Sequence, residues 1–248
     1  MSADFDAWAD IYRLWTAVSP DPDAEFYRRL AATAERPVVD LGVGLGRLAV
    51  LLAPDVGIDV SGEMIAEARR RLNGSVRLVQ SSIADYALDE PAGFSYAGQN
   101  TLNHVAPAEQ PVLFHAVYRN TRPGGRFAFE TALAQPARLR TRDRVPVLRS
   151  YSEQAVVYDI TRLADAQGHR AELIGMVERT DGAGRVVERR YFPPIPFTFL
   201  TVEVVTGWAT QAGWQVESVH ADPQGNPVTA DSPSAMWCLR RPRTDGRS

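Results

Sequence analysis

Residues Val38–Arg47, with the sequence VVDLGVGLGR, decide the fold of this chain. The apolar run predicts a buried strand, and the three alternate glycines predict a tight turn that leads into a helix. Glycine has no Cβ, so backbone N–H groups in such a turn can approach a bound molecule closely. A second apolar run, Val56–Val60, contains Asp59, nineteen residues after Asp40. An acid at the end of the second strand of a β–α–β unit can accept hydrogen bonds from a ribose, so the pattern predicts a nucleoside site.

The spacing of the glycines indicates which nucleoside the turn would hold. A dinucleotide site has the spacing G-x-G-x-x-G, with a pyrophosphate at the helix N-terminus. Here the third glycine, Gly46, comes one residue early, and an acid stands two residues before the first glycine. This arrangement resembles motif I of the class I S-adenosylmethionine-dependent methyltransferases, whose cofactor has no phosphate. The resemblance implies S-adenosylmethionine as the cofactor and S-adenosylhomocysteine as its product.

Four later segments resemble motifs of the same family, and they come in the same order. Asp59–Ile65 resembles the second motif, and Ser81–Ile83 stands where many members have Gly-Asp-Ala. Asn100–Val105 resembles the segment after the fourth strand in small-molecule N-methyltransferases, including the glycine and aminosugar N-methyltransferases. Arg122–Glu130 resembles the R-P-G-G turn into the fifth strand. The motifs together cover residues 36–131, and their order is more specific than any single motif.

The resemblance implies a set of cofactor-binding residues. Asp40 would organise the glycine turn and face the cofactor's ammonium group, Asp59 would bind the ribose, and Met64 would lie against the adenine. Ser82 replaces the usual acid at the adenine edge, which leaves a hydroxyl for that contact. Arg47 fits a cofactor contact and a surface cation equally well. The full set is Tyr12, Asp40, Gly42, Gly44, Gly46, Arg47, Asp59, Val60, Met64, Ser82, Ile83 and Asn100.

Two residues that follow strands are candidates for the transfer step. The methyl donor is a sulfonium, so transfer is an in-line displacement that needs the nucleophile, the methyl group and the sulfur to be aligned. A general base is needed only where the acceptor holds a proton that it does not lose unaided. His104 is the candidate catalytic base, with Asn100 beside it to anchor the acceptor; the alternative for His104 is packing at a helix start. Glu130 ends the fifth strand and could hold an acceptor's ammonium group; its alternative is a hydrogen bond to the backbone of the insertion described below.

Strands alternate with helices between residues 36 and 132, which predicts an α/β fold with a Rossmann-like, doubly wound, seven-stranded sheet. This segment would be the cofactor-binding core. An N-terminal helical lid, residues 1–35, would precede it. The expected core elements are strands 37–41, 56–60, 75–80, 93–98 and 125–131, and helices 46–53, 62–72 and 107–121.

The pattern changes after the fifth strand. Period-two runs indicate an antiparallel β insertion, residues 140–200, with a hairpin turn at Asp181–Gly184. A helix and two strands, residues 201–241, would then complete the sheet of a single methyltransferase domain, residues 1–248. Exposed Val-rich strands invite pairing, so the insertion would either cover the pocket or join two subunits as a homodimer.

Composition limits the partners. The net charge of −3 and the pI of about 5.8 argue against nucleic-acid binding, which needs a basic face. The single cysteine, Cys238, excludes an internal disulfide, and no histidine has metal-ligand spacing, so no metal is expected. The N-terminus lacks a signal-peptide pattern, and no apolar run is long enough to span a bilayer. We therefore expect a cytoplasmic protein with a small-molecule partner and no membrane contact.

The sequence predicts an enzyme that methylates a small molecule with S-adenosylmethionine. The resemblance at Asn100–His104 favours an amine of a metabolite or natural product over a hydroxyl or carboxylate acceptor. A Rossmann dehydrogenase is disfavoured by the glycine spacing, and a non-catalytic homologue that keeps only the cofactor pocket is a third hypothesis. The acceptor itself is not identified, because its pocket would be built from the lid, the insertion and the loop Asp222–Ser234, where the motifs are weakest.

Overall fold

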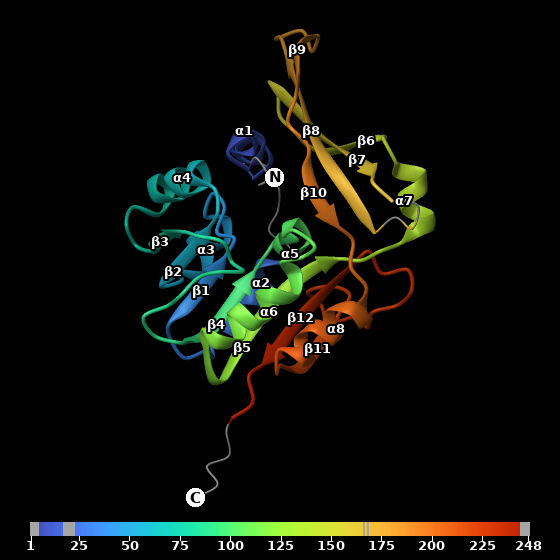
Figure 1. Ribbon diagram of the computed structural model, residues 1–248. Coiled ribbons are helices and arrows are strands. Elements are labelled where there is room, and N and C mark those ends of the chain that lie inside the picture. The colour runs from blue at the N-terminus through green and yellow to red at the C-terminus, as the bar shows by residue number, and fades with distance from the viewer. Residues whose placement is uncertain (1–4, 17–22, 166, 168, 244–248) are drawn as a thin grey trace, which may run out of the picture.

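A seven-stranded sheet forms the centre of the molecule (Figure 1). Its strands, in spatial order, are β11 (Gln215–His220), β12 (Ser234–Arg240), β5 (Thr121–Ala132), β4 (Ala92–Ala97), β1 (Val38–Leu41), β2 (Val56–Asp59) and β3 (Arg77–Gln80). The five strands from β5 to β3 are parallel, and β12 is antiparallel to both of its neighbours. The predicted α/β class and doubly wound sheet are confirmed. The structure is a computed structural model that describes residues 5–16, 23–165, 167 and 169–243, so residues 1–4 and 17–22 of the expected lid lie outside the described residues.

Helices cover both faces of this sheet. They are α2 (Ala24–Ala31), α3 (Arg47–Leu52), α4 (Gly62–Leu72), α6 (Gln110–Arg119) and α8 (Val202–Gln211). All four residues of β1 are buried; Val39 and Leu41 belong to the cluster that contains α6 and α8, whereas Val38 packs with α2 and α3. A parallel strand that is buried on two faces needs apolar residues at nearly every position, which explains the continuous run at the start of the glycine motif.

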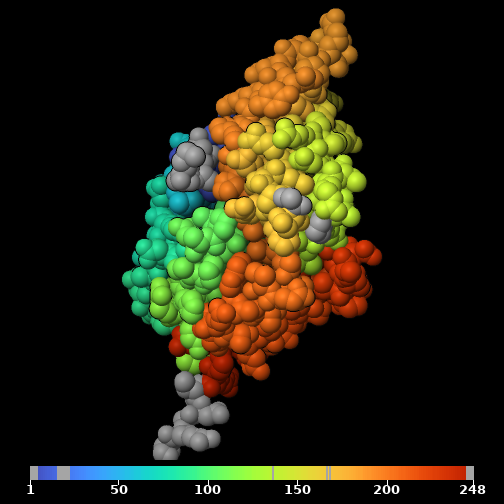
Figure 2. Space-filling model, turned by 45° about the vertical axis from the view of Figure 1, so that its right-hand side comes forward, coloured from blue at the N-terminus to red at the C-terminus, as the bar shows by residue number. Residues whose placement is uncertain are grey.

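The insertion forms a second, antiparallel sheet outside the first (Figure 1). Its strands are β6 (Pro146–Tyr151), β7 (Ala155–Leu163), β8 (Arg170–Thr180), β9 (Val186–Tyr191) and β10 (Ile195–Thr198). The order is β10-β8-β7-β6, and β9 pairs with the distal half of β8. The turn predicted at Asp181–Gly184 closes the β8–β9 hairpin, which projects from the body of the molecule (Figure 2).

Helix α1 (Phe5–Thr16) lies between α4 and the second sheet (Figure 1). Its buried residues Trp8 and Ile11 pack in one cluster with Val157 and Val177 of the insertion. The Trp8 indole N–H also donates a hydrogen bond to the Pro193 carbonyl at 2.7 Å. The N-terminal helix therefore connects the insertion to the cofactor-binding half of the sheet.

Three features differ most from the sequence prediction. Strand β5 begins at Thr121, so the R-P-G-G segment lies within it and not before it. The cause is a pair between Thr121 and Ala92, followed by a register shift that Gly124 accommodates at φ +81°. The expected helix 107–121 is observed as α6, which begins at Gln110, and a separate short helix, α5 (Thr101–His104), precedes it. Another helix, α7 (Pro136–Arg142), lies between β5 and β6, where no element was predicted.

Candidate active site

A cavity of about 530 Å³ lies at the carboxyl ends of β1, β2 and β4. Ligands of open α/β sheets bind at this edge, and the volume falls within the range of about 300–1,000 Å³ that is typical of ligand pockets. Ten of the twelve predicted cofactor-binding residues line it, namely Tyr12, Asp40, Gly42, Gly44, Arg47, Asp59, Val60, Met64, Ser82 and Ile83. The candidate base His104 also lines the cavity, whereas Gly46, Asn100 and Glu130 do not.

The glycine turn forms the floor of the cavity. Gly42 has φ +77°, and a Cβ at this position would lie 2.5 Å from Cγ2 of Thr101. A Cβ at Gly44 would meet nothing closer than 4.0 Å, so the backbone there borders open space. Gly46 does not line the cavity, and a Cβ there would contact Leu72 of α4 at 3.3 Å. This glycine permits α3 to pack against α4.

Asp59 at the end of β2 is oriented by two backbone N–H groups. Gly44 N–H donates to Oδ2 at 2.8 Å, and Ser61 N–H donates to Oδ1 at 2.9 Å. Burial raises the pKa of Asp59, and these N–H groups partly oppose that effect. Each carboxylate oxygen can accept a second hydrogen bond, so the side chain has capacity left for a diol such as a ribose. Ser61 also caps α4, since its hydroxyl accepts from Met64 N–H at 3.1 Å.

Asp40 and Arg47 lie deeper in the same wall. Burial raises the pKa of Asp40 to about 7, so a neighbouring cation would stabilise its charged form. Arg47 is buried and binds Asp23 through both terminal nitrogens, at 2.8 and 2.7 Å. It is therefore not a surface cation. It lines the cavity while its charge is compensated by a carboxylate at the start of α2.

The expected adenine side consists of Val60, Met64, Ser82 and Ile83. Met64 and Ile83 are buried apolar side chains, which suits the face of a base. The Ser82 hydroxyl accepts a hydrogen bond from Ala84 N–H at 3.2 Å and keeps one lone pair and its proton for a ligand. A hydroxyl that both donates and accepts can replace the usual acid at an adenine edge.

His104 lies in an aromatic enclosure at the other end of the cavity. Its ring makes edge contacts with Phe5, at 5.9 Å between centroids, and with Phe197, at 4.9 Å. Burial lowers the pKa of His104 to about 4, so the imidazole is neutral at pH 7. Nδ1 lies 3.2 Å from the carbonyl oxygen of Pro196, which can only accept a hydrogen bond. The proton therefore sits on Nδ1, and Nε2 is left as a hydrogen-bond acceptor.

Glu130 and Asn100 contact each other and not the cavity. Asn100 N–H donates to Oε1 of Glu130 at 2.9 Å. Burial, assisted by Asp23, raises the pKa of Glu130 to about 7, and the backbone N–H groups of Asn100 and Gln99 oppose this shift. The backbone that Glu130 binds belongs to the turn after β4 and not to the insertion, which was the alternative considered for this residue. The Asn100 side-chain oxygen is buried without a hydrogen-bond partner in the described part of the chain.

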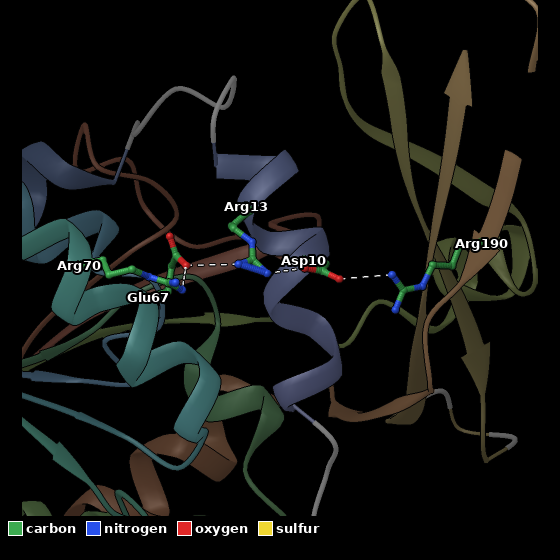
Figure 3. Close-up of polar contacts among 5 residues, drawn as sticks. All are labelled: Asp10, Arg13, Glu67, Arg70 and Arg190. Carbon is green, nitrogen blue, oxygen red and sulfur yellow. Dashed lines mark hydrogen bonds and ion pairs between the residues drawn. The ribbon is translucent and has the colours of Figure 1, made fainter. Parts of the chain in front are cut away.

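Helix α1 closes one side of the cavity with Phe5 and Tyr12. Burial raises the pKa of Tyr12 to about 12, so its hydroxyl stays protonated. Polar contacts fasten the helix on both sides (Figure 3): Arg13 binds Glu67 of α4 at 3.2 Å, and Asp10 binds Arg190 of β9 at 3.2 Å. Arg13 and Asp10 also pair with each other, which connects the two sets of contacts.

The sequence did not single out several residues that line the cavity. They are Phe5, Val43, Leu45, Leu48, Gly98, Gln99, Thr101, Val105, Ala106, Glu109 and Pro196. Phe5 comes from the N-terminal helix α1, and Pro196 comes from a strand, 92 residues after His104. Among the described residues, no group of three His, Cys, Asp or Glu side chains could hold a metal ion. None of the helices in those residues is both long enough and apolar enough to cross a membrane.

Comparisons with known proteins agree with this geometry. Residues 38–125 match a family model described as a methyltransferase domain. The trans-aconitate 2-methyltransferase of Acidovorax sp. (strain JS42) is 31% identical over 174 residues, which are 67% of this chain and 62% of that protein. The chain thus matches less than two thirds of the length of this relative.

Solved structures share the fold over nearly the whole chain. The CcbJ methyltransferase from Streptomyces caelestis has a TM-score of 0.80 and 24% identity, covering 96% of this chain and 97% of that one. CalS10, an amino pentose methyltransferase from Micromonospora echinaspora that was solved with bound S-adenosylmethionine, has a TM-score of 0.69 and 20% identity, covering 94% and 96%. At these identities the likeness shows the fold alone.

The sheet order, the glycine turn and the family match together define the class of the protein. The chain carries a class I methyltransferase domain, which confirms the resemblance found in its motifs. The cofactor expected for this family is S-adenosylmethionine.

Proposed function

We propose that the protein binds S-adenosylmethionine in the described cavity and transfers its methyl group to an amine nitrogen of a small molecule. The residues present suit this cofactor. Asp59 has acceptor capacity for the ribose, Asp40 is a buried acid that an ammonium would neutralise, and the backbone at Gly44 borders open space. Ser82 and Met64 provide a polar edge and an apolar face for the adenine.

The charges of the cavity wall are the observation that carries the choice of acceptor. Of the three carboxylic acids that line the cavity, Asp40 and Asp59 are assigned to the cofactor, so Glu109 is left to face the acceptor. The charge of the lining arginine, Arg47, is compensated by Asp23. A polyanionic acceptor such as trans-aconitate would enter this wall with no surplus positive charge to stabilise it. A neutral or cationic acceptor suits the wall better. This argument favours an amine over a carboxylate, despite the name of the curated relatives.

S-adenosylmethionine, when bound, would supply an activated methyl group on a sulfonium, and transfer to a free amine would move the positive charge from the sulfur to the acceptor nitrogen. The protein's contribution is alignment: rigid walls that hold the nucleophile close to the donor remove an entropic barrier of roughly 7–11 kcal/mol. Phe5 and Pro196 line the cavity beside His104, so the end where transfer would occur is bordered by apolar side chains. No covalent intermediate with a protein side chain is needed.

The lowered pKa of His104 indicates what this residue does. An imidazole with a pKa of about 4 is a poor base for an alkylammonium ion, whose proton is held with a pKa near that of lysine, about 10. The acceptor would therefore bind as the free amine, with an N–H donated to Nε2 of His104. This contact would direct the nitrogen lone pair toward the methyl group, so we assign His104 an orienting role and not that of a strong general base.

The test is transfer of a deuterium-labelled methyl group from S-adenosylmethionine to a panel of amines, amino sugars, phenols and trans-aconitate, followed by mass spectrometry. We expect labelled N-methyl products. Labelled trans-aconitate with no labelled amine would overturn the choice of acceptor, and failure of the parent protein to bind S-adenosylhomocysteine would overturn the choice of cofactor. Binding without turnover on the panel or on a metabolite extract would favour the non-catalytic hypothesis.

A His104→Ala variant, with His115→Ala as the matched control on α6, separates the two roles of the imidazole. We expect His104→Ala to lower the transfer rate by at least about tenfold while the pH profile keeps its shape and the affinity for S-adenosylhomocysteine stays near the parental value. A profile that loses an inflection in this variant would instead show general-base catalysis. Parental turnover in His104→Ala would exclude His104 from the reaction.

A further inference from the structure

The turn between β4 and α5 has an unusual backbone. Gln99 has φ +50° and Asn100 has φ +57°, so two consecutive residues other than glycine adopt the left-handed conformation. This conformation is unfavourable for residues with a Cβ and persists only where the surroundings enforce it, often beside a functional site. Gln99 and Thr101, on either side of Asn100, line the cavity, and α5 begins directly after the turn.

Glu130 supplies the enforcing contact at the start of this segment. The ladder between β4 and β5 ends at the pair Ala97–Phe129, and Glu130 is the next residue of β5. Its carboxylate accepts Asn100 N–H at 2.9 Å and also interacts with the backbone N–H of Gln99. A carboxyl group that accepts from successive N–H groups takes the place of the strand partner that the turn has lost.

Asn103 fastens the other end of the segment to the same strand. Its side-chain oxygen accepts Ala132 N–H at 3.0 Å, and its amide N–H group donates to the carbonyls of Ala132, at 3.0 Å, and of Thr198, at 2.6 Å. Asn103 is fully buried and precedes His104 in the chain. Both ends of a four-residue helix are thus bound to the last residues of β5, and the second contact also reaches β10.

We propose that Glu130 and Asn103 are positioning residues, which hold the turn at Gln99 and the helix α5 so that Gln99 and His104 face the reacting end of the cavity. The proposal rests on the proposed function for the identity of the reaction. Glu130 does not line the cavity, and acts through the backbone that it binds. A helix of only one turn has little stability of its own, so its orientation depends on these two side chains.

Four variants test the role of Glu130 and Asn103. Glu130→Gln keeps an oxygen acceptor of nearly the same shape, whereas Glu130→Ala removes it, and Asn103→Ala removes the second contact. Glu217→Ala is the matched control, since Glu217 is an acid of β11 in the same sheet that binds Arg126 and Arg240 away from the cavity. All are compared in the presence of S-adenosylhomocysteine, the probe for the cofactor site.

Hydrogen exchange and NMR report the position of the segment Gln99–His104, and neither measurement needs a methyl acceptor. In Glu130→Ala we expect the amides of Gln99 and Asn100 to exchange at least about tenfold faster, because their acceptor is lost. We expect the pKa of His104 to rise toward its ordinary value as the ring loses its enclosure, and Asn103→Ala to change His104 in the same direction. Glu130→Gln should restore most of the protection, and Glu217→Ala should match the parent.

With an acceptor from the labelling panel, Glu130→Ala should lower kcat by more than about tenfold while the KM for S-adenosylmethionine changes by less than about threefold. Glu130→Gln should recover most of kcat. Two results would overturn the proposal. The first is unchanged hydrogen exchange together with an unchanged His104 pKa in Glu130→Ala. The second is an equal loss of kcat in Glu130→Gln and Glu130→Ala while the amides of Gln99 and Asn100 stay protected from exchange in both variants. If the parent does not bind S-adenosylhomocysteine, the proposed function fails, but the exchange measurements still decide the positioning role.

Discussion

Replacement of Asp59 by asparagine gives the most direct test of the cofactor site. The carboxylate accepts Gly44 N–H on one oxygen and Ser61 N–H on the other, at 2.8 and 2.9 Å. An asparagine side chain has one acceptor oxygen, so one of the two N–H groups would face an NH₂ group. The loss of this hydrogen-bond acceptor destabilises the ligand-free protein, so we expect its free energy of unfolding to fall by about 1–3 kcal/mol.

The same replacement has a separate effect on binding. The charged acceptor for the ribose is lost, which costs about 1.5–3 kcal/mol in a charge-assisted hydrogen bond. The Kd for S-adenosylhomocysteine should therefore rise by about 10- to 150-fold, which isothermal titration calorimetry measures directly. Denaturant unfolding of the ligand-free variant measures the stability term independently.

Asp55→Asn is the matched control, because Asp55 lies just before β2 and also accepts a backbone N–H. Its Oδ2 binds Val38 N–H at 2.7 Å, and its Oδ1 binds Nε of Arg36 at 2.8 Å, at the opposite edge of the sheet from the cavity. This control should lose stability while its Kd for S-adenosylhomocysteine stays within about threefold of the parent. Equal affinity of Asp59→Asn and the parent would refute the assignment of Asp59 to the ribose.

Three further predictions follow from the buried acid, the glycine turn and the insertion. Burial raises the pKa of Asp40 to about 7, and a bound ammonium favours the charged form of this acid. The affinity for S-adenosylmethionine should therefore increase by up to about tenfold between about pH 6 and pH 7. Binding titrations of Asp40→Asn should show an affinity that does not change with pH in this range. Gly42→Ala should lose about 1–3 kcal/mol more stability in denaturant unfolding than Gly184→Ala, because both glycines have φ +77° but only the first would place a Cβ against a side chain; equal losses would contradict the steric argument. Tyr151 on β6 and Tyr191 on β9 are 71% and 57% exposed. If the insertion pairs two subunits, light scattering should show a dimer for the parent and a monomer for the variant in which both tyrosines are replaced by serine. A monomeric parent would exclude the homodimer.

Much of the cofactor site could be predicted because its signals are local. The strand, glycine turn and helix at Val38–Arg47 depend on burial pattern and on glycine conformation within a few residues, and the structure places them as expected. The location of Asp59 beside the glycine turn could be predicted by the same reasoning, since the end of the second parallel strand has only one place in such a sheet. The antiparallel character of the insertion likewise follows from period-two runs and the turn at Asp181–Gly184.

Side chains near the reacting end of the cavity were harder to predict. Glu130 and Asn100 both follow strands at the correct edge of the sheet, yet Glu130 binds the backbone of Asn100 and neither lines the cavity. Position at a strand end does not decide whether a side chain points outward or across to the neighbouring strand. Arg47 illustrates the same limit, because its partner Asp23 lies in a segment whose place against α3 no local pattern predicts.

The sequence by itself determined the α/β class, the glycine turn and the place of Asp59 at the end of β2, since each depends on periodicity and residue type over short stretches of chain. Only the tertiary structure decided how His104 is enclosed. Phe5, Phe197 and Pro196 reach it from the N-terminal helix and from a strand 92 residues away, and together they bury the imidazole and lower its pKa. Burial of that kind is a property of packing between distant segments, so the chemistry of the acceptor end follows from the fold and not from any motif in the chain.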